Sequence, residues 1–196
     1  MINKVSTHIL RFISRHTEIP MEMVDVYRYG IEITFSSIIN IVLIITCSLI
    51  VKNIWAGIVY LFVFIFLRTF SGGYHATTYF RCNLTFVISF VVTYFTFGVL
   101  VFYKSPIHIY EAISLLHLIP FVLFSPVPNK HKQLLDKQKR IFHRLSLIIA
   151  SVLSLVGIIL LVLRIDIGAM IILTVTMVSV LIIIETTMQR GGYHEG

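Results

Sequence analysis

The sequence predicts an all-α, polytopic membrane protein with about six transmembrane helices, and three observations support this fold class. Hydrophobic residues make up 57% of the 196 positions and charged residues only 13%. The mean hydropathy of +0.92 is higher than the core of a soluble protein of this size can accommodate. The apolar residues gather in long runs, and Lys and Arg fall between these runs with a strong bias toward one side.

The first element, residues 1–19, is predicted to be an amphipathic helix at the membrane interface. Ile2, Val5, Ile9 and Phe12 recur at a spacing of three to four, and basic residues lie elsewhere on the helical wheel. Such a helix lies on a membrane surface or, alternatively, receives a partner. Pro20 stands where the first turn of a new helix would begin.

Six apolar runs then approach the roughly 20 helical residues that a hydrocarbon core of about 30 Å requires. The fourth run contains Glu111, His117 and Pro120, and the second is short, so either of these helices can be broken or tilted. The predicted spans are residues 32–51, 54–68, 84–103, 107–124, 145–163 and 167–185.

The cationic residues indicate the orientation of these spans. With six spans and a cytoplasmic N-terminus, Lys52, Lys104 and Arg164 are the only ones of the 16 Lys and Arg residues on the outer side. Cytoplasmic segments of membrane proteins carry the excess of Lys and Arg. We therefore expect both termini and the polar segment 68–82 to face the cytoplasm.

A second basic segment, residues 125–144, follows the fourth span with the sequence SPVPNKHKQLLDKQKRIFHR. Pro126 and Pro128 are expected to end the helix, and six Lys or Arg residues follow. Runs of this kind commonly fix topology and bind anionic lipid headgroups. A docking surface for an acidic peptide is the second interpretation.

The polar segment RTFSGGYHATTYFRC, residues 68–82, brings together a histidine and a cysteine. A thiol beside an imidazole is the minimum equipment for nucleophilic acyl transfer, because the imidazole can accept the thiol proton. Arg68 and Arg81 would favour the thiolate form of Cys82. A palmitoylated or inert Cys82, and a His75 that binds headgroups, are the alternatives. Cys47 lies in an apolar run and is predicted to have a packing role.

His75 and Cys82 are too far apart to meet on one continuous helix. Seven residues return to the same helical face but rise by roughly 10 Å. The helix must therefore break between them, and Gly72-Gly73 supplies the flexible backbone. Non-helical backbone at membrane depth implies a polar pocket, here open to the cytoplasm. The sequence has no HExxH and no Cys-x-x-Cys, so neither a metal site nor a cofactor is expected.

The order Arg68, Gly73, His75, Cys82 resembles that of the accessory gene regulator B family, the membrane cysteine peptidases of Gram-positive peptide quorum sensing. YGIE at 29–32, the loop SPVPNKHK and the six spans extend the resemblance over essentially the whole chain. It implies a single membrane-embedded peptidase domain, residues 1–196, in a bacterial cell membrane. The implied partners are an AgrD-like propeptide, membrane lipids and a second copy in a homodimer, and no nucleic acid.

The resemblance also implies roles for individual residues. Cys82 would attack the propeptide, with His75 as base and then acid, and the propeptide's own cysteine would close a thiolactone. Gly73 and Arg68 would stabilise the oxyanion, although a hinge and a topogenic charge are their structural alternatives.

Further roles are implied around this pair. Ser71 would orient His75 or simply cap a helix, and Glu32 would pair with Arg68. Lys130 and Lys132 would bind the acidic tail of the propeptide. Two rival functions remain open at this stage: a small transporter that uses Glu111, His117 and Asp166, and a scaffold palmitoylated on Cys82.

Overall fold

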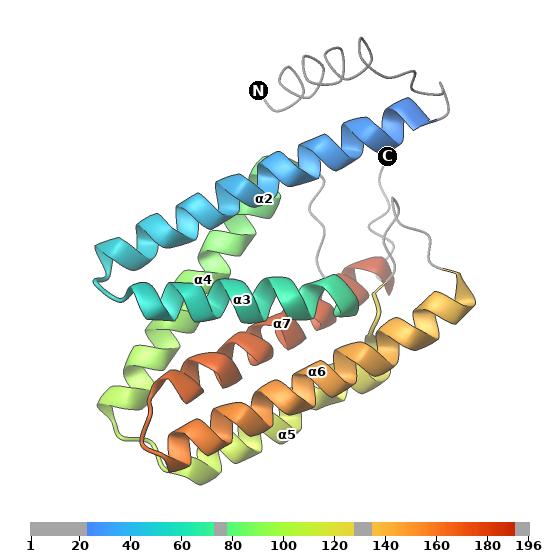
Figure 1. Cartoon of the computed structure of the whole chain (residues 1–196). Coiled ribbons are helices and arrows are strands. Elements are labelled where there is room, and N and C mark those ends of the chain that lie inside the picture. Colours follow the sequence, from blue (N-terminus) through green and yellow to red (C-terminus); the bar gives the residue numbers. More distant parts are fainter. Residues whose placement is uncertain (1–22, 73–77, 128–134, 191–196) are drawn as a thin grey trace.

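The computed structural model describes residues 23–72, 78–127 and 135–190, and within these residues it contains six helices and no strand (Figure 1). All six are long and apolar enough to cross a membrane. The predicted all-α polytopic fold is therefore confirmed. The predicted interfacial helix, residues 1–19, and Pro20 lie outside the described residues. The helices are α2 (Val24–Ile50), α3 (Ile54–Ser71), α4 (Tyr79–Phe102), α5 (Ile107–Phe124), α6 (Asp136–Val162) and α7 (Ile167–Arg190).

The helices extend beyond several of the predicted spans, and always at the same end of the bundle. α2 begins at Val24, α4 at Tyr79 and α6 at Asp136, and α7 continues to Arg190. Hydropathy detects only the apolar part of a helix, whereas the backbone hydrogen bonds continue through polar turns outside it. The fourth span has its predicted limits, and Pro120 lies inside the continuous helix α5.

α7 is the central helix of the bundle, and α2 lies at its edge (Figure 1). α7 packs against α3, α4, α5 and α6, and 67% of its most apolar stretch of 18 residues is buried. α2 packs mainly against α3 and α4, and just 17% of its most apolar stretch of 18 residues is buried. The apolar side chains that α2 leaves exposed are suited to contact with lipid.

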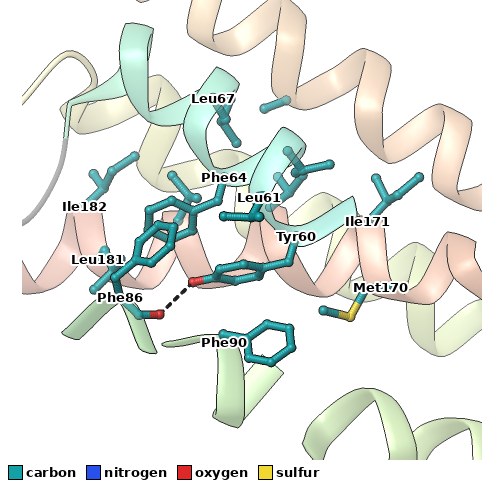
Figure 2. Close-up of a cluster of buried hydrophobic side chains, with 14 of the residues drawn as sticks. Tyr60, Leu61, Phe64, Leu67, Phe86, Phe90, Met170, Ile171, Leu181 and Ile182 are labelled. Atoms are coloured by element: carbon teal, nitrogen blue, oxygen red, sulfur yellow. Dashed lines mark hydrogen bonds between the residues drawn. The ribbon is translucent and has the colours of Figure 1, made fainter. Parts of the chain in front are cut away.

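Figure 2 shows the aromatic cluster that fixes α3 against α4. The Tyr60 and Phe90 ring centroids are 5.2 Å apart, and those of Phe64 and Phe86 are 4.7 Å apart, both with edge-to-face geometry. The Tyr60 hydroxyl donates to the Phe86 carbonyl at 3.2 Å, so this phenol is satisfied inside the core. Met170, Ile171, Leu181 and Ile182 of α7 complete the cluster.

The connections at one end of the bundle, which we call the turn end, are three tight turns with the same construction. Each has a cationic residue in the left-handed region: Lys52 (φ 55°), Lys104 (φ 47°) and Arg164 (φ 61°). In each turn the next residue donates its N–H to the carbonyl five residues before it, at 2.8 to 3.0 Å. This is the Schellman arrangement, which satisfies the last carbonyls of a helix without help from other helices.

The opposite end, which we call the basic end, carries most of the charge. Of the Lys and Arg residues that the structure describes, three lie at the turn end and eight at the basic end. The observed distribution therefore has the predicted asymmetry. The eight are Arg28, Arg68, Arg81, Lys137, Lys139, Arg140, Arg144 and Arg190.

Close glycine contacts hold two helical hairpins together near the turn end. A Cβ added at Gly57 of α3 would overlap the Ser48 side chain of α2. Gly157 of α6 and Gly168 of α7 are equally close, since a Cβ on either would collide with the backbone of the other. Small residues let helix backbones approach closely in membranes. From their shared turn, α2 and α3 diverge toward the basic end (Figure 1).

Candidate active site

The helix break that the His75 and Cys82 spacing requires is present. α3 ends at Ser71 and α4 begins at Tyr79, so Cys82 lies on a different helix from Arg68. Gly72 follows α3 with φ +70° and ψ −152°, a conformation that L side chains rarely adopt, and its N–H donates to the Arg68 carbonyl at 3.1 Å. Gly73 and His75 lie outside the described residues.

Cys82 lies at the start of α4. The hydroxyl of Thr78, the N-cap residue, accepts from the Arg81 N–H at 3.3 Å, and the Cys82 N–H donates to the Thr78 carbonyl at 3.0 Å. The thiol is free and the residue is partly buried. The N-terminal end of a helix dipole favours negative charge, as on a thiolate.

Cys47, the second free cysteine, has different surroundings. It is partly buried in the last turn of α2 and packs against the hydrophobic core. Its predicted packing role is confirmed.

The aromatic cluster pairs residues of α3 with residues of α4 next to the segments that hold Arg68 and Cys82. α3 and α4 are antiparallel, so four residues forward on α3 correspond to four residues back on α4. Tyr60 pairs with Phe90, and Phe64 with Phe86. Arg68 lies four residues after Phe64 on α3, and Cys82 lies four residues before Phe86 on α4, so both follow this cluster on the side of the basic end. The Arg68 guanidinium also lies over the Phe64 ring, 5.6 Å from its centroid.

A polar seam runs between α2 and α4 beside Cys82. The Tyr79 hydroxyl donates to Glu32 Oε2 at 2.7 Å, and the Ser36 hydroxyl donates to Asn83 Oδ1 at 2.7 Å. Both pairs combine a residue of α2 with one of α4, and Glu32 and Ser36 are buried. The first turns of α4 are thus fixed to α2 by side chains as well as by packing.

Sequence reasoning identified Glu32 but missed Ser36 and the two α4 residues of this seam. Tyr79 and Asn83 belong to the first turn and a half of α4, which hydropathy alone did not include in a helix. A signal was available, because Glu32, Ser36 and Asn40 recur every four residues in an otherwise apolar run.

Ser71 contributes to a second polar cluster at the end of α3. It is fully buried, and its hydroxyl donates to the Gly72 carbonyl at 3.1 Å. Its carbonyl accepts from the Val127 N–H at 3.0 Å. The segment Ser125–Val127, which we call the strap, therefore packs against the point where the chain leaves α3.

α6 holds the strap from its other side. His143 Nδ1 donates to the Ser125 carbonyl at 2.7 Å, and the Ser125 and Ser146 hydroxyls are 2.7 Å apart. Sequence reasoning did not single out any of these three residues: Ser125 and His143 lie in the basic segment, and Ser146 lies in the predicted fifth span. Lys130 and Lys132 lie outside the described residues, while Lys137, Arg140 and Arg144 line a groove on α6 with Ile141.

The residues that a transporter would need are not arranged as a pathway. Only His117 is buried, and its Nδ1 and Nε2 lie 3.0 Å and 2.7 Å from the hydroxyls of Thr176 and Ser154. Glu111 and Asp166 are exposed toward the turn end. His117 thus links α5, α6 and α7. The described residues also contain no group of three His, Cys, Asp or Glu side chains that could hold a metal ion.

The sequence profile of one family, accessory gene regulator B, matches residues 6–183. The chain belongs to the AgrB family. Membership and the six apolar helices together establish a multi-pass membrane protein with a role in processing the quorum-sensing peptide of the agr system. No curated protein and no solved structure matches the chain significantly.

Proposed function

We propose that this AgrB-family chain is a cysteine endopeptidase that removes the acidic C-terminal tail of an AgrD-like propeptide and promotes thiolactone formation. The observation that carries the proposal is the position of Cys82 in the first turn of α4, a helix that begins only after α3 has ended at Ser71, with His75 between the two helices in the sequence. The whole chain acts as one peptidase domain with the basic end toward the cytoplasm, as its charge distribution favours.

The first step is acyl transfer to the enzyme. His75 takes the thiol proton, and Cys82 Sγ attacks the carbonyl carbon at the border between the middle segment and the tail of the propeptide. A C–S bond forms, the C–N bond breaks, and His75 returns the proton to the leaving amine. The products are a free tail and a thioester-linked acyl-enzyme.

The second step transfers the acyl group to the propeptide itself. The thiol of the propeptide's internal cysteine gives its proton to His75, and its sulfur attacks the thioester carbonyl. A new C–S bond closes the thiolactone, the C–S bond to Cys82 breaks, and His75 returns the proton to the Cys82 sulfur. One thioester is exchanged for another, so no external energy source is needed. Water would instead release a linear acid, and a site at the membrane boundary limits that loss by excluding water.

Three groups support the negative charge that develops on the attacked oxygen. Arg68 lies in the last turn of α3, and the backbone N–H of Gly73 follows the end of α3 closely in sequence. The positive end of the α4 dipole acts in the same direction. The hydrogen bond between Glu32 and Tyr79 holds the start of α4, and with it Cys82, against α2.

The substrate is recognised through charge and an apolar surface. Lys130 and Lys132 bind the acidic tail, and the α6 groove lined by Lys137, Arg140 and Arg144 extends the same positive surface. The interfacial helix, residues 1–19, lies beside the amphipathic leader of the propeptide.

The test is processing of a synthetic propeptide by the purified protein in liposomes, followed by mass spectrometry. We expect Cys82→Ala, Cys82→Ser and His75→Ala to lose cleavage, and Cys47→Ala, the matched control at the other cysteine, to retain it. A propeptide with its internal cysteine changed to alanine should accumulate as an adduct on Cys82. Unchanged processing by Cys82→Ala would refute the proposal.

A further inference from the structure

The strap, Ser125–Val127, joins the two segments on which the proposed function depends. On one side it contacts Ser71, which only three residues separate from His75. On the other side it leads directly into residues 128–134, which contain Lys130 and Lys132. The strap is thus the structural connection between the substrate-binding loop and the catalytic segment.

The contact between the strap and the end of α3 has no spare room. The Val127 N–H donates to the Ser71 carbonyl at 3.0 Å. A Cβ added at Gly72 would lie 2.7 Å from the Val127 carbonyl oxygen and 3.1 Å from its nitrogen. Gly72 also has a φ of +70°. Any side chain at this position would therefore push the strap away and strain the backbone at the exit from α3.

The strap itself is held by α6. The Ser125 carbonyl accepts from His143 Nδ1, so that the Nδ1–H tautomer is the one that fits, and the Ser125 hydroxyl is 2.7 Å from that of the fully buried Ser146. Buried backbone groups in a loop need such partners. A continuous series of hydrogen bonds thus runs from His143 through the strap to the last turn of α3.

We propose that the strap and His143 position the catalytic segment by fixing the place and direction in which the chain leaves α3 toward His75. His143 is a positioning residue, because it acts through the backbone of Ser125 and Ser71. The proposal rests on the proposed function, in which His75 must reach Cys82. Misplacement of a reacting group by about 1 Å can cost roughly a hundred-fold in rate.

Kinetics in liposomes provide the first test. We expect Gly72→Ala and His143→Leu to lower kcat by roughly ten- to a hundred-fold, with KM changed less than about two-fold. His143→Asn should recover most of the activity, since its amide nitrogen can occupy the place of Nδ1. The matched controls are Gly98→Ala, where a Cβ meets open space, and the exposed His108→Leu at the turn end.

Hydrogen–deuterium exchange gives a second, activity-independent readout. In His143→Leu the Val127 amide should exchange faster, because its hydrogen bond to Ser71 is loosened. Unchanged exchange, or faster exchange with kcat within about two-fold of the wild type, overturns the proposal. Failure of the proposed function looks different, because in that case Cys82→Ala itself continues to process the propeptide.

Discussion

The three connections at the turn end are built in the same way, whereas the part of the basic end that the structure describes depends on contacts between separate segments. At the turn end, Lys52, Lys104 and Arg164 each close a helix with hydrogen bonds inside their own turn. At the basic end, the Val127 N–H donates to the last carbonyl of α3. The Ser125 carbonyl in the same segment accepts from His143 of α6. The last carbonyls are satisfied within each turn at the turn end, whereas at the end of α3 a segment distant in sequence takes part.

This difference indicates where the fold can support chemistry. A self-contained turn reverses the chain and places few demands on neighbouring residues. A segment held by side chains from several helices is costly to maintain, because each partner must be present, but it can fix the positions of reacting groups. The predicted catalytic residues all belong to the end of the second kind.

The largest effect is expected for Arg68. Replacing Arg68 with Ala should lower kcat by roughly a hundred-fold or more, because an oxyanion-stabilising group is lost. Arg190 is a matched control at the same end, since its guanidinium lies over Phe124 at 5.3 Å much as that of Arg68 lies over Phe64. The rate of propeptide processing in liposomes gives kcat for Arg68→Ala and for Arg190→Ala. Equal losses for the two variants would assign Arg68 a structural role.

Charge at the two ends should have unequal consequences for substrate binding. The double variant Lys130→Gln and Lys132→Gln should raise KM by about ten-fold and weaken its salt dependence, because attraction of the acidic tail is lost. Lys52→Gln with Lys104→Gln removes the same charge from the turn end and should leave KM unchanged. Measurement of KM at several ionic strengths distinguishes the two double variants. Unaltered affinity in the first variant would exclude tail binding by these lysines.

A smaller effect is expected from His117, which lies between the two ends. The Ser154 and Thr176 hydroxyls also donate to the Ala150 and Ile172 carbonyls, so neither is left without a partner in His117→Leu. The free energy of unfolding should fall by only about 1–2 kcal/mol, a typical value for interhelical hydrogen bonds in membranes. Steric-trapping or denaturant unfolding in micelles measures this. Processing per folded molecule should persist, and its loss would revive a role for His117 in function.

The smallest effect is expected from Lys104→Gly. Glycine removes the cost of the left-handed conformation but also the favourable charge at a helix C-terminus, so the net stabilisation should be at most about 1 kcal/mol. Processing should not change. The same unfolding assay gives the value, and a large loss of stability would show that this turn depends on the lysine side chain.

The fold class and the six spans could be predicted because each span carries its own hydropathy signal. The helix break before Cys82 could also be predicted, since seven residues of helix separate two groups that must meet. The polar turns at the start of α4 were missed, and with them Tyr79 and Asn83, because these residues become partners of Glu32 and Ser36 only when α2 and α4 pack. The strap was missed for the same reason, as Ser125 and His143 form an ordinary polar sequence until the fold brings Ser71 to them.

The glycine contacts near the turn end have a mechanical consequence for the distant site. Gly57 lies about one turn from the shared connection of α2 and α3, whereas Glu32 lies roughly 27 Å along α2 from it, at 1.5 Å per residue. The two helices share one short connection and meet again close to it, where Gly57 contacts Ser48. If Gly57 and Ser48 were forced apart, two rigid helices that diverge from this connection would be separated several-fold more at the level of Glu32. A methyl group at Gly57 would therefore displace Glu32, the partner of Tyr79, without contacting any residue of the site.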